Sequence, residues 1–129
     1  MDPHLALFAN DAFYVAFATR DGAAMADIWS RLHPVSCIHP GWPALFGREA
    51  VVESWQRILA NTDAPDVQVH NARAVLLDRM VNVLCYEVIG GQTLVATNCF
   101  VLEDGAPRLV HHQAGPCADP PAPEANAVQ

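Results

Sequence analysis

The stretch "VQVHNARAVLLDRMVNVLCYEVIGGQTLVATNCFVLEDGAPRLVHHQAG", Val67 to Gly115, alternates apolar and polar residues over long runs. Three short turn signals interrupt it: Asp78-Arg79, Gly90-Gly91 and Asp104-Gly105. A period of two is typical of strands with one buried face, and two-residue turns join antiparallel neighbours. The stretch therefore predicts four consecutive antiparallel strands, over residues 67–77, 80–89, 93–103 and 108–114.

The residues before this stretch predict three helices and one short strand. Asp2-Pro3 is typical of a helix start, and apolar residues then recur at helical spacing to about Thr19. Asp21 is placed to cap a second helix, which we expect to run to Pro34. A short strand over residues 35–39 follows. A third helix begins after Gly47 and is ended by the segment Asn61 to Pro65.

Helices first and antiparallel strands afterwards indicate an α+β fold in which a curved sheet covers the helices. A chain of 129 residues fits a single domain, which we assign to residues 1–115. The last segment, residues 116–129, carries four prolines and no apolar periodicity. We expect it to be a mobile tail without a function of its own.

The charge and composition exclude several classes of function. The net charge is −7 and basic residues occur singly, so nucleic acid and anionic membranes are not expected partners. The N-terminus resembles neither a signal peptide nor a membrane-spanning helix, and we expect a cytoplasmic protein with buried free thiols. No phosphate-binding loop or dinucleotide fingerprint occurs, and no zinc set completes Cys37 with His39 or His111 with His112. We expect no cofactor and no metal.

Three local motifs resemble one family. They are "IHP" at residues 38–40, "GREAVVESW" at residues 47–55 and "RLVHHQAG" at residues 108–115. Together with the order of elements they resemble the nuclear transport factor 2-like superfamily, in particular its small bacterial SnoaL-like members, over Leu5 to Gly115. The resemblance implies a cone-shaped cystatin-like fold with an apolar pocket and a homodimer formed through the sheet. Pro107 and Gly115 depart from the usual pattern at the last strand.

The resemblance to one member, ketosteroid isomerase, implies two catalytic residues. His39 stands at the position of its general base, and Tyr14 at that of its oxyanion-holding tyrosine. An imidazole suits the role, since its ordinary pKa of about 6.5 leaves much of it neutral near pH 7. Asn98, beside Thr97, offers a weaker donor where that enzyme has an aspartic acid. The plain alternatives are a hydrogen-bonded turn histidine for His39 and a core aromatic residue for Tyr14.

Further residues are candidates for contact with a ligand. Trp42 lies on the turn after the short strand, and Trp55 lies in the third helix. On the last strand, alternation places His111 and Gln113 on one face and His112 on the other. The resemblance favours His111 and Gln113 inside the pocket and His112 at the dimer or solvent face.

Two classes of function remain open at this level. The first is a cofactor-independent isomerase, cyclase or dehydratase that acts on an apolar carbonyl or polycyclic substrate by acid-base catalysis. The second is a non-catalytic module for ligand binding or dimerisation. Because members of one fold have many functions, only the geometry of the site can separate these classes. Both imply a small apolar molecule or a second copy of the chain as the partner.

Overall fold

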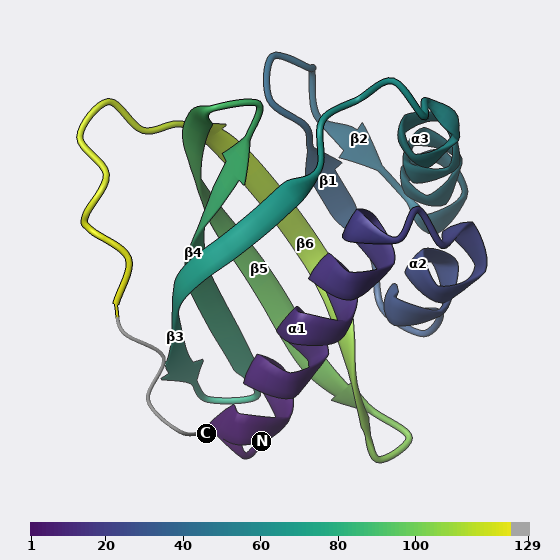
Figure 1. Cartoon of the computed structure of the whole chain (residues 1–129). Helices are drawn as coiled ribbons and strands as arrows, with labels where there is room; N and C mark the ends of the chain where they lie inside the picture. Colours follow the sequence, from purple (N-terminus) through teal and green to yellow (C-terminus); the bar gives the residue numbers. More distant parts are fainter. Residues whose placement is uncertain (125–129) are drawn as a thin grey trace.

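The computed structural model describes residues 1–124, in which three helices pack against one six-stranded sheet. The helices are α1 (Pro3–Ala18), α2 (Gly22–Ile28) and α3 (Arg48–Ala60). The strands are β1 (Ser36–Ile38), β2 (Leu45–Phe46), β3 (Val67–Leu77), β4 (Met80–Ile89), β5 (Gln92–Glu103) and β6 (Ala106–Pro116). Figure 1 shows α1 lying across the concave face of the curved, open sheet, with α2 and α3 beside it. The predicted α+β class is confirmed.

The sheet has the order β2-β1-β6-β5-β4-β3, and within it only β1 and β6 run parallel. The four long strands begin and end within two residues of the predicted bounds. Their turns contain residues with positive φ, including Asp78, Gly90 and Asp104, as tight hairpins require. The strand β2, only two residues long, was not predicted because so short a segment carries no periodic signal.

The starts of α1 and α2 are capped as their sequences predict. The Asp2 carboxylate accepts a hydrogen bond from the His4 amide at 2.9 Å, and Asp21 accepts one from the Ala24 amide at 3.0 Å. The third helix follows Gly47, whose φ of 88° is a conformation that favours glycine. These three positions fix where the chain turns into each helix.

The second helix is shorter than predicted, because it ends at Ile28 and not at Pro34. Trp29 is already extended and pairs with Leu109 of β6. Arg48 holds the open end of the helix: its guanidinium donates to the carbonyls of Trp29 at 2.7 Å and Ala26 at 2.8 Å. The arginine of the "GREA" motif therefore caps a neighbouring helix, and the apolar spacing that continues through Trp29 and Leu32 was misleading.

The core lies between α1, α3 and the concave face of the sheet. Its largest fully buried side chains include Phe13, Trp29, Trp55 and Phe100. Cys37 and Cys85 are buried, whereas Cys99 and Cys117 are half-buried, and no disulfide joins cysteines among residues 1–124. None of the helices described is long and apolar enough to cross a membrane.

The segment after β6 touches the body of the domain as far as Glu124. The Cys117 amide donates to the Thr93 carbonyl at 3.0 Å. Asn71, at a register shift in β3, donates through its side chain to the Ala122 carbonyl at 3.1 Å and accepts from the Glu124 amide at 2.7 Å. A proline-rich composition alone does not reveal such contacts, because two of the three come from one side chain far away in the sequence. The rest of the predicted tail, residues 125–129, lies outside the described residues.

Candidate functional site

A cavity of about 320 Å³ opens between α1, α3, the loop after β1 and the concave face of the sheet. Most of its lining is apolar, with Phe17, Trp42, Trp55, Ile58, Ile89 and Leu94. Four polar side chains also reach it, those of His39, Glu87, Gln92 and His112. An apolar cavity with a few converging polar groups is the usual form of a small-molecule site, and this one lies at the lower end of the usual range of about 300–1,000 Å³.

His39 lies immediately after β1, where the chain turns into the loop that carries Trp42. Its ring is 3% exposed and lies between two indoles, with centroid distances of 4.8 Å to both Trp42 and Trp55. Its Nε2 is 2.8 Å from the hydroxyl of Ser54 in α3. Burial lowers the pKa of His39 to about 4, so the imidazole is neutral near pH 7. The imidazole of His39 is therefore unprotonated near pH 7 and can accept a proton.

His112 lies on β6 and is also buried. Its Nδ1 is 2.5 Å from the side-chain oxygen of Asn98 on β5, and its ring centroid is 5.6 Å from that of Trp55. Burial, with a contribution from the charge of His39, lowers the pKa of His112 to about 3. The cavity therefore has two neutral imidazoles in its wall, with ring centroids 6.4 Å apart.

Glu87 on β4 brings the one carboxyl group to the cavity among the described residues. The side chain is 1% exposed, and one oxygen, Oε2, accepts a hydrogen bond from the Tyr14 hydroxyl at 2.5 Å. Burial raises the pKa of Glu87, although the bond from Tyr14 acts in the opposite direction. Glu87 is thus biased toward holding a proton, which is the property of a general acid.

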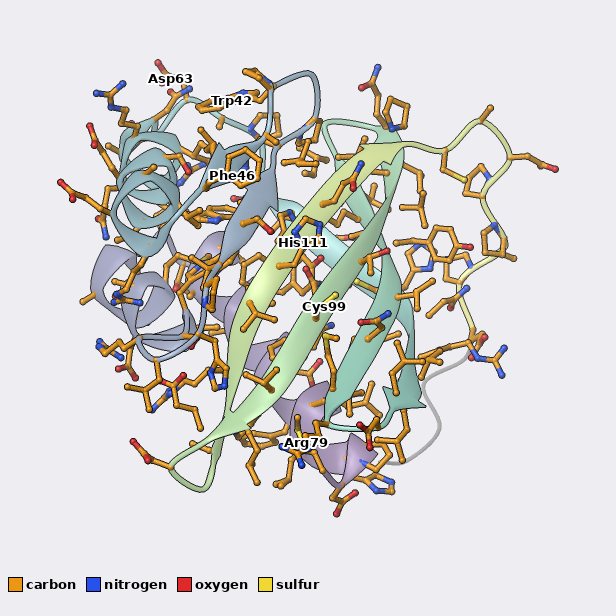
Figure 2. The ribbon with its side chains drawn as sticks, turned by 180° about the vertical axis from the view of Figure 1, so that it is seen from behind. Trp42, Phe46, Asp63, Arg79, Cys99 and His111 are labelled. Atoms are coloured by element: carbon orange, nitrogen blue, oxygen red, sulfur yellow. The ribbon has the colours of Figure 1, made fainter. Side chains whose placement is uncertain are left out.

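The predicted orientation of the last strand is wrong. Cys99 pairs with His111 while its neighbour Phe100 pairs with Leu109, so Val110 is an extra residue that makes a β-bulge. A bulge reverses the alternation beyond it, and for this reason Leu109 and His112 both point inward. Figure 2 shows His111 on the face of the sheet turned away from the helices, beside Cys99. There the Nδ1 of His111 lies 2.7 Å from the Ser36 hydroxyl.

Gln113 belongs to the same outer face as His111 and is exposed, so neither residue lines the cavity. Of the other predicted residues, His39, Trp42 and Trp55 do line it. Tyr14 and Asn98 lie one layer deeper and reach the cavity through Glu87 and His112.

Sequence reasoning missed Glu87 and assigned His112 to the wrong face of the sheet. A signal for Glu87 exists, since it continues the inward series Val81, Val83 and Cys85 on β4, where a carboxylate is unexpected. No such signal exists for His112, because a bulge cannot be located from alternation alone.

The arrangement supports proton transfer. A neutral base and a carboxyl group with a raised pKa meet the same mostly apolar cavity, which is the combination required for acid-base catalysis. Within residues 1–124 no three His, Cys, Asp or Glu side chains are grouped so that they could hold a metal ion.

The chain is similar to several known proteins. The F-box protein SKIP8 of Arabidopsis thaliana is 31% identical over 107 residues, which cover 81% of this chain and 46% of that protein. The chain thus spans about half the length of that relative. A solved structure of a proposed dehydratase of the NTF2-like family from Streptomyces avermitilis is 31% identical, with a TM-score of 0.80, and the match covers 92% of this chain and 97% of that chain.

A second solved structure, a proposed calcium/calmodulin-dependent protein kinase type II association domain from Thiobacillus denitrificans, is also 31% identical. Its TM-score is 0.75, and the match covers 84% of this chain and 92% of that chain. The predicted cystatin-like fold is confirmed. A family model described as a SnoaL-like domain matches residues 7–119. The chain therefore belongs to the SnoaL-like family of the nuclear transport factor 2-like superfamily.

Proposed function

We propose that this protein binds a small, mostly apolar carbonyl compound in the cavity and catalyses proton transfer on it without a cofactor. The observation that carries the proposal is the meeting of a neutral imidazole, His39, and a carboxyl group with a raised pKa, Glu87, in one apolar cavity. Enzymes that move protons commonly separate the pKa values of an acid and a base in this way. The similarity to a proposed dehydratase supports the same reaction type.

In the proposed step, His39 takes a proton from the carbon next to the carbonyl group, and the electron pair moves to the carbonyl oxygen. The Glu87 carboxyl donates a hydrogen bond or its proton to that oxygen. Return of the proton to another carbon gives isomerisation, and loss of a neighbouring hydroxyl group as water gives dehydration. Both outcomes conserve all atoms and need no co-reactant other than the two side chains.

Tyr14 has a supporting role in this proposal. Its hydroxyl donates to Glu87 Oε2 and accepts from the thiol of Cys85 at 3.3 Å and the amide of Asn98 at 3.2 Å. The hydroxyl of Tyr14 therefore has all its hydrogen bonds within the protein, and its role is to hold the Glu87 carboxyl in place. Trp42 and Trp55 enclose His39 and supply the apolar surface for the ligand.

Binding is tested with 2-tetralone, a bicyclic apolar ketone, by nuclear magnetic resonance of the histidine side chains. We expect the ring signals of His39 and His112 to shift as the ketone is added, because both rings line the cavity. The signals of His4 and His111 serve as internal controls, since neither residue lines the cavity. Shifts confined to the controls, or no shift at any concentration that 2-tetralone reaches in water, would contradict the proposed pocket.

We also propose that two copies of the chain pair through the outer face of the sheet. This face carries exposed apolar side chains, including Leu84 and Val95, next to half-buried Tyr86 and Val101. Several apolar side chains exposed on one face of a sheet are typical of an interface. The observation also favours the second class of function, a dimerisation module, which is compatible with a ligand in the cavity because the two surfaces lie on opposite sides of the sheet.

The pairing predicts a particle of twice the 14.0 kDa mass of one chain in light scattering. Leu84→Glu places a charge in the middle of the outer face and is expected to give the monomer mass. Leu32→Glu is the matched control, because Leu32 is exposed in the loop after α2 and is not part of the sheet. A monomer mass for the unaltered chain at micromolar concentration would refute the pairing, and dimers of Leu84→Glu would place the interface elsewhere.

A further inference from the structure

We infer that the cavity binds a neutral ligand with an O–H donor more tightly than a ligand of the same shape without one, because the fold presents His39 Nδ1 and His112 Nε2 as hydrogen-bond acceptors. The inference rests on the small-molecule pocket proposed above and specifies the class of ligand. The inference comes from the hydrogen bonds that each imidazole makes with the protein, because these bonds decide which ring nitrogen carries the proton.

For His39 the deciding group is Ser54. A serine hydroxyl has one hydrogen to donate, and Ser54 donates it to the Val51 carbonyl within α3 at 2.7 Å. The Ser54 oxygen can then only accept from the Nε2 of His39, 2.8 Å away. A neutral imidazole has a single N–H, so Nδ1 of His39 is left with its lone pair. The thiol of Cys37 lies 3.9 Å from Nδ1 and 3.7 Å from Nε2, and a thiol is a weak hydrogen-bond partner.

For His112 the deciding group lies at the end of a longer chain of hydrogen bonds. The Tyr14 hydroxyl donates its only hydrogen to Glu87 Oε2. The oxygen of Tyr14 can therefore only accept, and it accepts from the Asn98 side-chain amide at 3.2 Å. The same amide donates to the side-chain oxygen of Asn10 at 2.8 Å. The oxygen of Asn98 therefore faces His112 and requires a proton on its Nδ1.

With Nδ1 of His112 donating inward, Nε2 carries the lone pair, and among residues 1–124 the hydrogen bonds of this ring go through Nδ1 alone. Both imidazoles are then acceptors, in a wall that is otherwise mostly apolar. An O–H group satisfies such a nitrogen, whereas an ether leaves it without a partner.

The cavity is also unsuited to anions. No Arg or Lys occurs among its lining residues, and the carboxyl group of Glu87 lies in the same wall. The net charge of −7 adds to this effect. A carboxylate ligand would lose its hydration without gaining a cation, so it is expected to bind more weakly than a neutral compound of the same shape.

The proton positions can be measured without any ligand. Nitrogen-15 spectra of the histidine rings near neutral pH are expected to show the proton of His39 on Nε2 and that of His112 on Nδ1. A proton on Nδ1 of His39, or on Nε2 of His112, would overturn the inference whatever the protein binds.

The ligand class is tested with three compounds of one shape: 2-naphthol, 2-methoxynaphthalene and 2-naphthoate. We expect 2-naphthol to bind about 3- to 10-fold more tightly than the ether, the range given by one hydrogen bond, and also more tightly than the carboxylate. Equal or tighter binding of the ether or the carboxylate would overturn the selectivity and leave the pocket itself intact. If none of the three moves the signals of the cavity residues, the pocket and the selectivity both fail.

A pair of serine variants separates recognition from folding. Ser54→Ala frees His39 to exchange its proton between the two nitrogens, so the preference for 2-naphthol over the ether should shrink. Ser36→Ala is the matched control, since Ser36 also bonds to a histidine, His111, but on the outer face of the sheet. Both variants are checked for an unchanged folded spectrum. An equal effect of the two substitutions would contradict the role of Ser54 in setting the acceptor.

Discussion

His39→Gln is expected to lower the rate of proton exchange at the carbon next to the carbonyl of 2-tetralone by about 10²- to 10⁴-fold, the usual contribution of a general base. Glutamine has nearly the length of histidine and can still donate an N–H to Ser54, but it has no basic nitrogen. The substitution thus removes the proton acceptor and keeps the bond that anchors the side chain to α3. The measurement is loss of the hydrogen signals of 2-tetralone in deuterated water, corrected for the uncatalysed rate.

Three comparisons make this result specific. His111→Gln, on the outer face of the sheet, is expected to leave the rate unchanged. Tyr14→Phe should lower the rate less than His39→Gln, because Tyr14 acts only through Glu87. If His39→Gln exchanges hydrogen as fast as the unaltered protein and merely unfolds at a lower temperature, His39 holds the turn before Trp42 and is not a base.

The pH dependence follows from the two pKa shifts. Above pH 4 the imidazole of His39 is neutral, so the rate should fall as the pH is lowered through about 4. Glu87, whose pKa burial raises above the ordinary 4.5, supplies a proton only below its pKa, so the rate should fall again as the pH rises past that value. The rate is therefore expected to have a maximum between the two values.

The fold was predictable from the sequence because the turns between its strands are specified by residues within the turns themselves. The hairpins are set by Asp-Arg, Gly-Gly and Asp-Gly pairs, and these fix the ends of four strands to within two residues. The second helix was predicted too long, since its apolar spacing continues through Leu32 although that side chain is 66% exposed. What ends the helix comes from far away in the sequence: Arg48 caps its carbonyls, and the Glu103 carboxylate accepts from the amides of Arg31 and Leu32.

The site was predictable only in part, for a similar reason. His39 could be found because a polar residue ends an apolar strand beside a turn, and the structure places it in the cavity. His112 depends on a one-residue bulge, which exchanges the faces of β6 and is decided by pairing with β5. The roles of Tyr14 and Asn98 depend on Glu87 and His112, so the two deeper residues could not be assigned correctly before the two in front of them were known.

Phe13→Ala is expected to lower the free energy of unfolding by about 3–5 kcal/mol, the usual cost of removing a buried phenylalanine ring. Phe13 is fully buried, and its ring centroid lies 4.8 Å from that of Tyr14, 5.3 Å from Trp55 and 5.1 Å from His112. Domains of this size are stable by about 5–15 kcal/mol, so the loss is a large share of the total. Urea denaturation followed by circular dichroism measures it.

Phe8 supplies the matched control, since it lies on the same helix but is 77% exposed. Phe8→Ala should change the free energy of unfolding by no more than about 0.5 kcal/mol, as surface substitutions usually do. If the two variants lower the free energy of unfolding equally, the cluster around Phe13 does not form the core of this domain.

Because Phe13 contacts both Trp55 and His112, a second expectation follows for Phe13→Leu, which keeps most of the apolar volume. That variant should remain folded while the ring of His112 loses one of its two close aromatic neighbours and keeps Trp55. We expect the side-chain signals of His112 to shift and the preference for 2-naphthol over the ether to change, with a smaller loss in the free energy of unfolding than in Phe13→Ala. A Phe13→Leu protein with unaltered His112 signals would show that Asn98 and Trp55 position the imidazole without Phe13, and that the Phe13 ring contributes only to stability.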